Sequence, residues 1–354
     1  MFCNTFRVLD KVSQYIVREV IEKGPQEPEE IVFRVLLFNT FTRIETWELL
    51  ERELAPLTWA TYDRGRYQKV LGRAKVRGKI LYTGSFIKPA PSFGYSDNCM
   101  NHLCLLEILM ENELSARLCK ADYMADVYEF IVSFPSMGDF TTYQLMLNLS
   151  YSNLLNFHSN DFVIPGPGAI SGLRKMFGSS INKAKPSVRG FEVEVIRWLA
   201  ETQDQHFKRL GIPFSGLGPD KVPMGVADIE HVLCEVDKYS RLAHPNFKGK
   251  RTEIRRRYEP SSAPYPKNPC LPKAWTHPDR LIPRIRPGGP PVVEKRYTIH
   301  RIGGHRKGKD EDEFLVYWHG YADEDATWEP KQLLLEDAPL AVAEYLEKEG
   351  LDSV

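Results

Sequence analysis

Three aromatic residues near the C-terminus, Tyr297, Trp318 and Tyr321, have side chains that could surround a quaternary ammonium group. An alkylated ammonium is poorly hydrated and donates few or no hydrogen bonds, so aromatic faces bind it by cation–π attraction and apolar contact. Asp325 follows closely and would place a negative charge beside such a cage. The pattern predicts a methyl-lysine site, and the alternative is that these rings only fill a small core.

The elements that must position this cage follow from the alternation of side chains. Residues from Tyr297 to Ile302 alternate as in a strand, and Gly303-Gly304 favours a turn after it. Phe314 to Trp318 predicts a second strand, and Ala338 to Glu349 predicts a terminal helix.

The segment from about Glu294 to Glu349 resembles a chromodomain. The runs FLVYWHGY (314–321) and DEDATWEP (323–330) stand in the spacing of that family. The resemblance implies a three-stranded antiparallel sheet plus a C-terminal helix, and a methylated histone tail, H3-like, as partner. It implies that Tyr297, Trp318 and Tyr321 form the methyl-lysine cage with Asp325 beside it. It also implies that Glu329 contacts the bound peptide.

Within this resemblance, Trp328 and Phe314 match core residues rather than walls of the cage. Arg296 and Leu333 depart from the family's pattern at positions that flank the peptide. The peptide sequence that is preferred therefore stays open. A chromodomain that contacts proteins without reading methylation is the alternative.

The charge of the chain is segregated although its 354 residues carry a net charge of +0. Residues 245–291 hold 11 Lys and Arg against 3 Asp and Glu, whereas residues 292–354 hold 8 against 15. An acidic chromodomain suits a basic histone tail, and a basic linker suits nucleic acid.

The six cysteines do not form a metal-binding pattern, because Cys99, His102 and Cys104 cluster without a second ligand pair. We therefore expect neither metal nor cofactor. No apolar run approaches the roughly 20 residues that span a bilayer, so we expect no membrane partner. Reduced thiols and the chromodomain resemblance together favour a nuclear location, while the oligomeric state stays open.

Residues 245–291 hold 11 of the 25 prolines and predict an extended, poorly packed linker. Arg255, Arg256 and Arg257 lie at its basic centre. They are interpreted as DNA contacts, a nuclear-import signal or a solvated spacer, and these functions are mutually compatible. Trp275 is unusual in a spacer, and we expect it to dock onto a flanking domain.

Residues 1–244 predict a large all-α domain, because helical periodicity recurs along them. The segments expected to be helical are Glu29 to Phe41, Thr46 to Leu54, Cys104 to Cys119, Asp122 to Ser133, Tyr143 to Phe157, Phe191 to Leu210 and Val226 to Leu242. Together with the linker (245–291) and the chromodomain (292–354), they predict a multidomain chain of one all-α and one α+β domain.

Two glycine-bearing turns, around Gly138 and around Gly166 and Gly168, resemble helix-hairpin-helix turns, whose amides approach a DNA phosphate. Such turns are more often only tight connections. Arg174 and Lys175 follow the second turn and would supply cations to the phosphate.

A second resemblance covers most of residues 30–242. It is carried by FNTF (38–41), LYTG (81–84), GDF (138–140) with Tyr143-Gln144, DFVIPGPG (161–168) and IEHVLCE (229–235). These motifs resemble the helical domain associated with 5-hydroxymethyldeoxyuridine DNA kinases, allied to the alpha-glutamyl/putrescinyl thymine pyrophosphorylase group. The resemblance implies a glycosylase-like helical domain that handles DNA with a modified thymine. Kinase chemistry is not supported, because no GxxxxGK[ST] loop occurs in the sequence.

Three residues are candidates for acid–base catalysis on such a base. His231 and Glu235 are adjacent on a helix, so the carboxylate could orient the imidazole. Asp161 lies 23 residues after Gly138, a spacing similar to that of the essential aspartate in helix-hairpin-helix glycosylases. An ordinary helix pair is the alternative for His231 and Glu235.

Asn39, Arg43 and Gln144 are further candidates for contacts to DNA. The leading hypothesis is a chromatin protein whose chromodomain targets a helical domain that binds or modifies DNA bearing modified thymine, of the 5-hydroxymethyluracil type. A non-catalytic chromatin adaptor and a glycosylase-like or transferase enzyme remain the alternatives.

Overall fold

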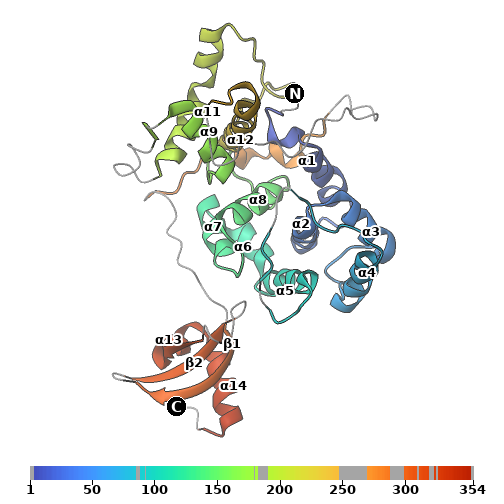
Figure 1. Ribbon diagram of the computed structural model, residues 1–354, viewed down its shortest axis with the longest axis vertical. Coiled ribbons are helices and arrows are strands. Elements are labelled where there is room, and N and C mark those ends of the chain that lie inside the picture. The colour runs from blue at the N-terminus through green and yellow to red at the C-terminus, as the bar shows by residue number, and fades with distance from the viewer. Residues whose placement is uncertain are drawn as a thin grey trace.

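The computed structural model describes residues 4–84, 88–91, 93–178, 180–181, 190–246, 269–287, 299–308, 311–318, 323 and 326–351. A helical part is followed by a small three-stranded sheet with two helices, which lies apart from the other helices in Figure 1. The helical elements before residue 250 are η1 (Arg7–Leu9), α1 (Lys11–Tyr15), η2 (Ile16–Ile21), α2 (Pro28–Phe41), α3 (Ile44–Leu54), α4 (Arg64–Val76), α5 (Asn98–Glu111), α6 (Leu114–Lys120), α7 (Met124–Val132), α8 (Asp139–Leu149), α9 (Pro167–Phe177), α11 (Phe191–Leu210) and α12 (Val226–Ala243).

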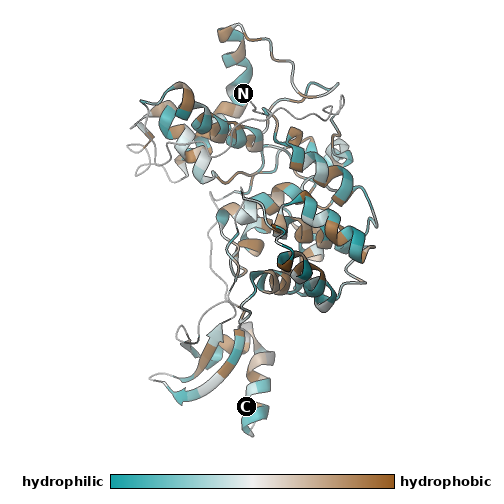
Figure 2. Cartoon of the chain, turned by 45° about the vertical axis from the view of Figure 1, so that its right-hand side comes forward, coloured by the Kyte–Doolittle hydropathy of each residue, from teal (hydrophilic) through white to brown (hydrophobic). Residues whose placement is uncertain are grey.

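Helix α2 is the central element of the helical part. Nearly all of its residues from Ile31 to Phe41 are buried, and it packs against α3, α5, α6, α8 and η2. A helix that is apolar on all sides is stable only inside a protein, where neighbours cover every face. Most of the other helices carry hydrophobic and hydrophilic residues side by side (Figure 2). The buried residues of the helical part form one continuous core.

Most of the helices expected from periodicity are present, and two expectations on their bounds are wrong. The segment Cys104 to Cys119 is divided between α5 and α6, because Glu113 adopts a left-handed conformation with φ 54°. The segment Tyr143 to Phe157 is helical only as far as Leu149. Ser150 and Ser152 instead donate their hydroxyls to nearby carbonyl groups, at 2.8 and 2.6 Å, which competes with continued helix.

Residues 269–287, here named the strap, pack on the helical part and are not the poorly packed spacer that their composition predicts. They contain η3 (Lys273–Thr276) and η4 (Pro278–Arg280). Trp275 docks on the core of the helical part, as expected, and lies 6.4 Å from the Tyr151 ring. Arg280 donates to the carbonyl oxygens of Ser150 and Leu155 at 2.7 and 2.6 Å. Carbonyl groups of the loop that follows α8 thus accept hydrogen bonds from this guanidinium and hold the strap in place.

The C-terminal part contains β1 (Ile299–Lys307), β2 (Asp312–Trp318), β3 (Thr327–Pro330), α13 (Lys331–Asp337) and α14 (Pro339–Glu349). The strands are antiparallel in the order β1-β2-β3. The predicted turn at Gly303-Gly304 is instead part of β1, where the register shifts between Ile302 and Gly304. Glycine at such an irregularity accommodates a bulge in place of a turn.

The core of this part lies between the sheet and the last helices, and it includes Phe314, Val316, Val342 and Tyr345. Phe314 is buried, as predicted. Trp328 is only half-buried, because it pairs with Leu315 on the other face of the sheet and the Arg306 guanidinium lies over its ring at 4.2 Å.

Candidate functional site

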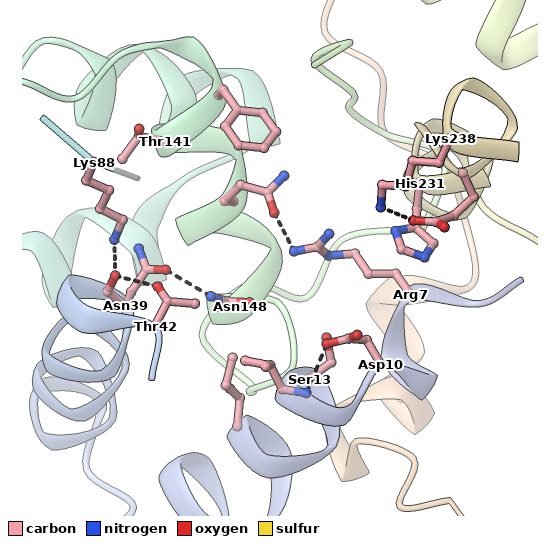
Figure 3. A pocket seen from close by; sticks show the side chains of 15 residues that line it. Arg7, Asp10, Ser13, Asn39, Thr42, Lys88, Thr141, Asn148, His231 and Lys238 are labelled. Carbon is pink, nitrogen blue, oxygen red and sulfur yellow. Dashed lines mark hydrogen bonds and ion pairs between the residues drawn. The ribbon is translucent and has the colours of Figure 1, made fainter. Parts of the chain in front are cut away.

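A cavity of about 220 Å³ opens between η1, α1 and α2 near the N-terminus and the helices α8 and α12, which come from two distant regions of the sequence. Figure 3 shows the side chains that line it. They are Arg7, Asp10, Val12, Ser13, Ile16, Asn39, Thr42, Lys88, Phe140, Thr141, Gln144, Asn148, His231, Glu235 and Lys238. Four residues proposed from the sequence for catalysis or DNA contact, Asn39, Gln144, His231 and Glu235, therefore meet in one place.

Amide side chains form one wall of the cavity. Asn39 on α2 and Asn148 on α8 are both buried, and the Asn148 Nδ2 donates to the Asn39 Oδ1 at 3.1 Å. Gln144 lies one turn before Asn148 on α8 and accepts a hydrogen bond from the Arg7 guanidinium. Buried amides that are held by neighbours present fixed donors and acceptors, which is what recognition of a planar heterocycle requires.

Arg7 reaches the cavity because the N-terminal segment is fixed to α12. Its backbone N–H donates to Asp228 Oδ1 at 2.8 Å, and Gly225 donates to the other oxygen at 3.1 Å. Burial raises the pKa of Asp228 to about 6, although these hydrogen bonds favour the ionised form. The first turn of α12 therefore positions the Arg7 side chain next to Gln144.

His231 and Glu235 line the cavity from α12, one helical turn apart. Burial lowers the pKa of His231, the charge of Arg7 lowers it further, and Glu235 raises it. Glu235 also forms an ion pair with Lys238. The imidazole is thus held in its neutral form, in which it can accept or donate one proton.

Asp161 lies away from this cavity, so the expected association with His231 and Glu235 is not found in the described residues. Its Oδ2 accepts the His158 N–H at 2.8 Å, and its Oδ1 accepts the Arg284 N–H at 2.6 Å. The Arg197 guanidinium donates to the Asp161 carbonyl at 2.9 Å. Burial is the main cause that raises the pKa of this carboxyl. Both of its oxygens are used to hold backbone groups, including one from the strap.

The second glycine turn packs against α12, and its first amide is already bonded within the protein. The Gly166 N–H donates to the buried Glu230 carboxylate at 3.0 Å. A Cβ on Gly168 would lie 2.4 Å from the Cys234 Sγ. No helix directly precedes this turn, because the described residues between α8 and Gly166 form a loop. Close contact between α9 and α12 is the reason for these glycines.

The two cationic residues after this turn differ in whether their charge is available to a DNA phosphate. The side chain of Lys175 is 7% exposed, and its Nζ lies 2.9 Å from Asp237 Oδ1, so its charge is neutralised by this ion pair. Arg174 is exposed and stays a candidate for a phosphate contact.

The first glycine turn does connect two helices, α7 and α8. Gly138 is exposed and has φ −77°, so its backbone conformation is open to other residues. Asp139 lies in the first turn of α8 and would repel a phosphate there. Arg43 pairs with Glu45 at 3.2 Å near the start of α3, and it does not line the cavity. Arg255, Arg256 and Arg257 lie outside the described residues.

In the C-terminal part, Trp318 is half-buried at the end of β2. Its Nε1 donates to the Thr327 hydroxyl at 2.8 Å, and that hydroxyl donates to Glu329 Oε1 at 2.6 Å. This chain of hydrogen bonds connects two residues proposed from the sequence, and it fixes the orientation of the indole. Tyr297, Tyr321 and Asp325 lie outside the described residues.

Several residues of the cavity were not found by sequence reasoning. Asn148 could have been found, because it follows Gln144 by one turn on the same helix face. Arg7 and Lys88 carried no signal, since they belong to segments that only the tertiary structure brings to α2 and α8. The described residues hold no cluster of three or more His, Cys, Asp or Glu that could bind a metal ion. Among the described helices, none combines the length and apolar character that crossing a membrane requires.

Comparison with known proteins identifies both parts of the chain. No solved structure matches it. Residues 297–348 match the chromo (chromatin organisation modifier) domain, which suggests association with chromatin. Residues 1–249 match the 5-hmdU DNA kinase helical domain, which suggests a DNA-related function and covers most of the chain. The protein therefore belongs to the family of the 5-hmdU DNA kinase helical domain, and it carries a chromodomain after that domain.

Proposed function

We propose that this protein is a nuclear chromatin protein whose helical domain binds DNA bearing a modified thymine, of the 5-hydroxymethyluracil type, and receives the modified base in the 220 Å³ cavity. The observation that carries the proposal is the convergence of Asn39, Gln144, Asn148 and Arg7 on this one cavity. Its chromodomain would bring the helical domain to nucleosomes by binding a methylated histone tail.

The size and chemistry of the cavity suit a single base. Pockets for drug-sized ligands are about 300–1,000 Å³, so a cavity of 220 Å³ fits a smaller molecule. A uracil ring offers two carbonyl oxygens and one N–H, which amide and guanidinium side chains can bind together. Proteins that act on a base inside a duplex take it out of the stack into such a pocket. The hydroxyl of a 5-hydroxymethyl group would add one more hydrogen-bonding partner.

The chromodomain function is supported by Trp318 and the hydrogen bonds that orient it. An aromatic wall binds a methylated ammonium best when its ring is held in place before binding. Residues 292–354 carry 8 Lys and Arg against 15 Asp and Glu, so their field attracts a basic, H3-like tail. On the sequence pattern, Tyr297, Tyr321 and Asp325 would complete this cage, and Glu329 would contact the peptide.

A catalytic function is the second candidate, and it is favoured by the His231–Glu235 pair in the cavity wall. A neutral imidazole beside a carboxylate can transfer a proton to or from a bound base. Incubating the protein with 5-hydroxymethyluracil DNA and analysing the nucleosides by mass spectrometry would detect base release or modification. Activity that His231→Gln abolishes supports the enzyme, whereas tight binding without turnover supports the adaptor.

The DNA proposal is tested by fluorescence anisotropy with duplexes that contain either one 5-hydroxymethyluracil or thymine at the same position. We expect tighter binding to the modified duplex. Gln144→Leu removes a cavity amide, and we expect it to reduce that preference about tenfold, as loss of one buried hydrogen bond does. Gln68→Leu on the exposed surface of α4 is the matched control. Equal affinity of the unaltered protein for both duplexes would contradict the proposal.

The histone proposal is tested by titrating the full chain with trimethylated and unmethylated H3-like peptides. We expect Trp318→Ala to weaken trimethyl-lysine binding by about 2 kcal/mol, or roughly 30-fold. Trp198→Ala is the matched control, because Trp198 is an exposed tryptophan on α11. Equal affinity of the unaltered protein for the two peptides would remove the methyl-lysine proposal while leaving the DNA proposal intact.

A further inference from the structure

Lys88 lies where the large cavity meets a second, smaller one. It lines both the 220 Å³ cavity and a neighbouring space of about 30 Å³. Its Nζ donates to the backbone carbonyl of Asn39, as Figure 3 shows. Among the described residues, no ion pair joins this amine to a carboxylate, although Asp10 and Glu235 line the same cavity. Lys88 therefore differs from Lys238, whose charge is paired with Glu235.

The surroundings of Lys88 disfavour its charged form. Burial lowers the pKa of the Lys88 amine to about 7. On the far side, His102 lines the smaller cavity, and its Nδ1 lies 2.9 Å from the Tyr82 hydroxyl. Burial, and then the nearby Lys88 amine, lower the pKa of His102 to about 4. A neutral imidazole supplies no negative charge that could stabilise the Lys88 ammonium.

We propose that Lys88 is an amine nucleophile that condenses with an aldehyde on DNA bound in the large cavity. This inference rests on the proposed function, because it requires a DNA group in the cavity, and it names the chemical class of that group. Two DNA aldehydes share this chemistry: a 5-formyl group on uracil and the open sugar of an abasic site. One hydrogen bond from Nζ to Asn39 leaves the nitrogen lone pair available to a ligand in the cavity.

The reaction balances without any oxidant or reductant. The Nζ lone pair attacks the carbonyl carbon, and the proton that nitrogen loses moves to the carbonyl oxygen, which gives a carbinolamine. The hydroxyl group then leaves as water with a second proton, and a C=N bond joins Lys88 to the DNA. His231 and Glu235 are the titratable groups of α12 that line the same cavity, and protons could reach them through water in it.

A lowered pKa increases the fraction of the amine that is uncharged, and therefore nucleophilic, at neutral pH. A lysine with the ordinary pKa of about 10.4 is uncharged in roughly one molecule in 2,500 at pH 7. An amine with a pKa of about 7 is uncharged in about half of the molecules. The nucleophilic form is thus far more abundant at Lys88 than at an exposed lysine.

The test is reductive trapping with the full chain. The protein is mixed with duplexes that carry 5-formyluracil, an abasic site or 5-hydroxymethyluracil, and cyanoborohydride reduces any C=N bond to a stable amine. We expect a covalent protein–DNA product with at least one aldehyde duplex and none with 5-hydroxymethyluracil. Peptide mass spectrometry should place the adduct at Lys88, and the two aldehyde duplexes distinguish base from sugar as its source.

Lys88→Met should reduce trapping at least 100-fold, whereas the control Lys69→Met on the exposed surface of α4 should not change it. Trapping that survives Lys88→Met, or an adduct mapped to another lysine, overturns the inference. The same duplexes are also titrated without reductant. Binding of modified DNA without any trapped product refutes the nucleophile and leaves the proposed function standing, whereas absence of preferential binding refutes the proposed function itself.

Discussion

Replacing Asp161 with asparagine should destabilise the protein without removing a group from the cavity. The Asp161 carboxylate accepts backbone N–H groups from His158 and Arg284 at 2.8 and 2.6 Å. Asparagine keeps one acceptor oxygen and places an NH₂ group against the other N–H. Asp161→Asn therefore loses one of the two hydrogen bonds and leaves a backbone donor unsatisfied.

The magnitude follows from these two bonds. A hydrogen bond to a charged group contributes roughly 1.5–3 kcal/mol, and an unsatisfied buried group costs about 1–3 kcal/mol. The neutral amide offsets part of this loss, because burial disfavours the charged carboxylate that it replaces. We expect Asp161→Asn to lower the free energy of unfolding by about 2 kcal/mol.

Urea unfolding of the full chain, followed by far-ultraviolet circular dichroism, measures this change. Asp220→Asn is the matched control, because Asp220 is exposed, and we expect it to change the free energy of unfolding by less than about 0.5 kcal/mol. Hydrogen exchange of the Arg284 amide should accelerate in Asp161→Asn, since that amide loses its acceptor. Unchanged stability together with lost processing of modified DNA would refute this reasoning and show that Asp161 acts on the substrate.

Three further changes test the packing and the pH dependence by urea unfolding. Gly172→Ala should lower the free energy of unfolding by about 1–3 kcal/mol, because its Cβ would lie 2.1 Å from the Leu233 carbonyl oxygen. Gly72→Ala has nothing within 4 Å of its Cβ and should raise the free energy of unfolding by roughly 0.5–1 kcal/mol. Equal effects of the two changes would contradict this packing. Arg280→Met should lower the free energy of unfolding by about 2 kcal/mol and accelerate hydrogen exchange in the strap, because the Arg280 guanidinium donates to three carbonyl groups. Unchanged hydrogen exchange in the strap would refute this anchoring role. The pKa of His102 falls to about 4 on folding, so the unfolded chain binds more protons below pH 6.5. Stability should therefore fall as pH drops from about 6.5 toward 4, and His102→Gln should flatten that dependence; an equally steep loss in the variant would assign it to other groups.

Much of the fold was predictable, because helices and strands depend on contacts between residues that are close in the sequence. The segment Phe191 to Leu210 was predicted with the bounds of α11, and it ends at Gly211, which adopts a positive φ of 64°. The strands β1 and β2 followed from alternation, and the terminal helix followed from its apolar face. The His231–Glu235 pair was equally local, because residues four apart on a helix are neighbours.

The cavity and the strap could not be predicted in this way. Arg7 and Gln144 are 137 residues apart, and Arg7 and Asp228 are 221 apart, so no local pattern relates them. The glycines around Gly166 illustrate the same limit, since the pattern resembles a phosphate-binding turn and the structure uses it to pack α9 on α12. Periodicity shows that a side chain is buried but not which distant surface covers it.

The sequence by itself determined the two-part architecture, the helices of the first part, and the chromodomain with Trp318 and Glu329 in it. Only the tertiary structure decided that Lys88 and Arg7 reach the same cavity as His231, and that Asp161 holds the strap instead. The physical reason is that secondary structure forms from short-range hydrogen bonds and periodic burial, which depend on residues close together in the sequence. A site is formed by packing between distant segments, and its chemistry depends on which charges that packing leaves unpaired.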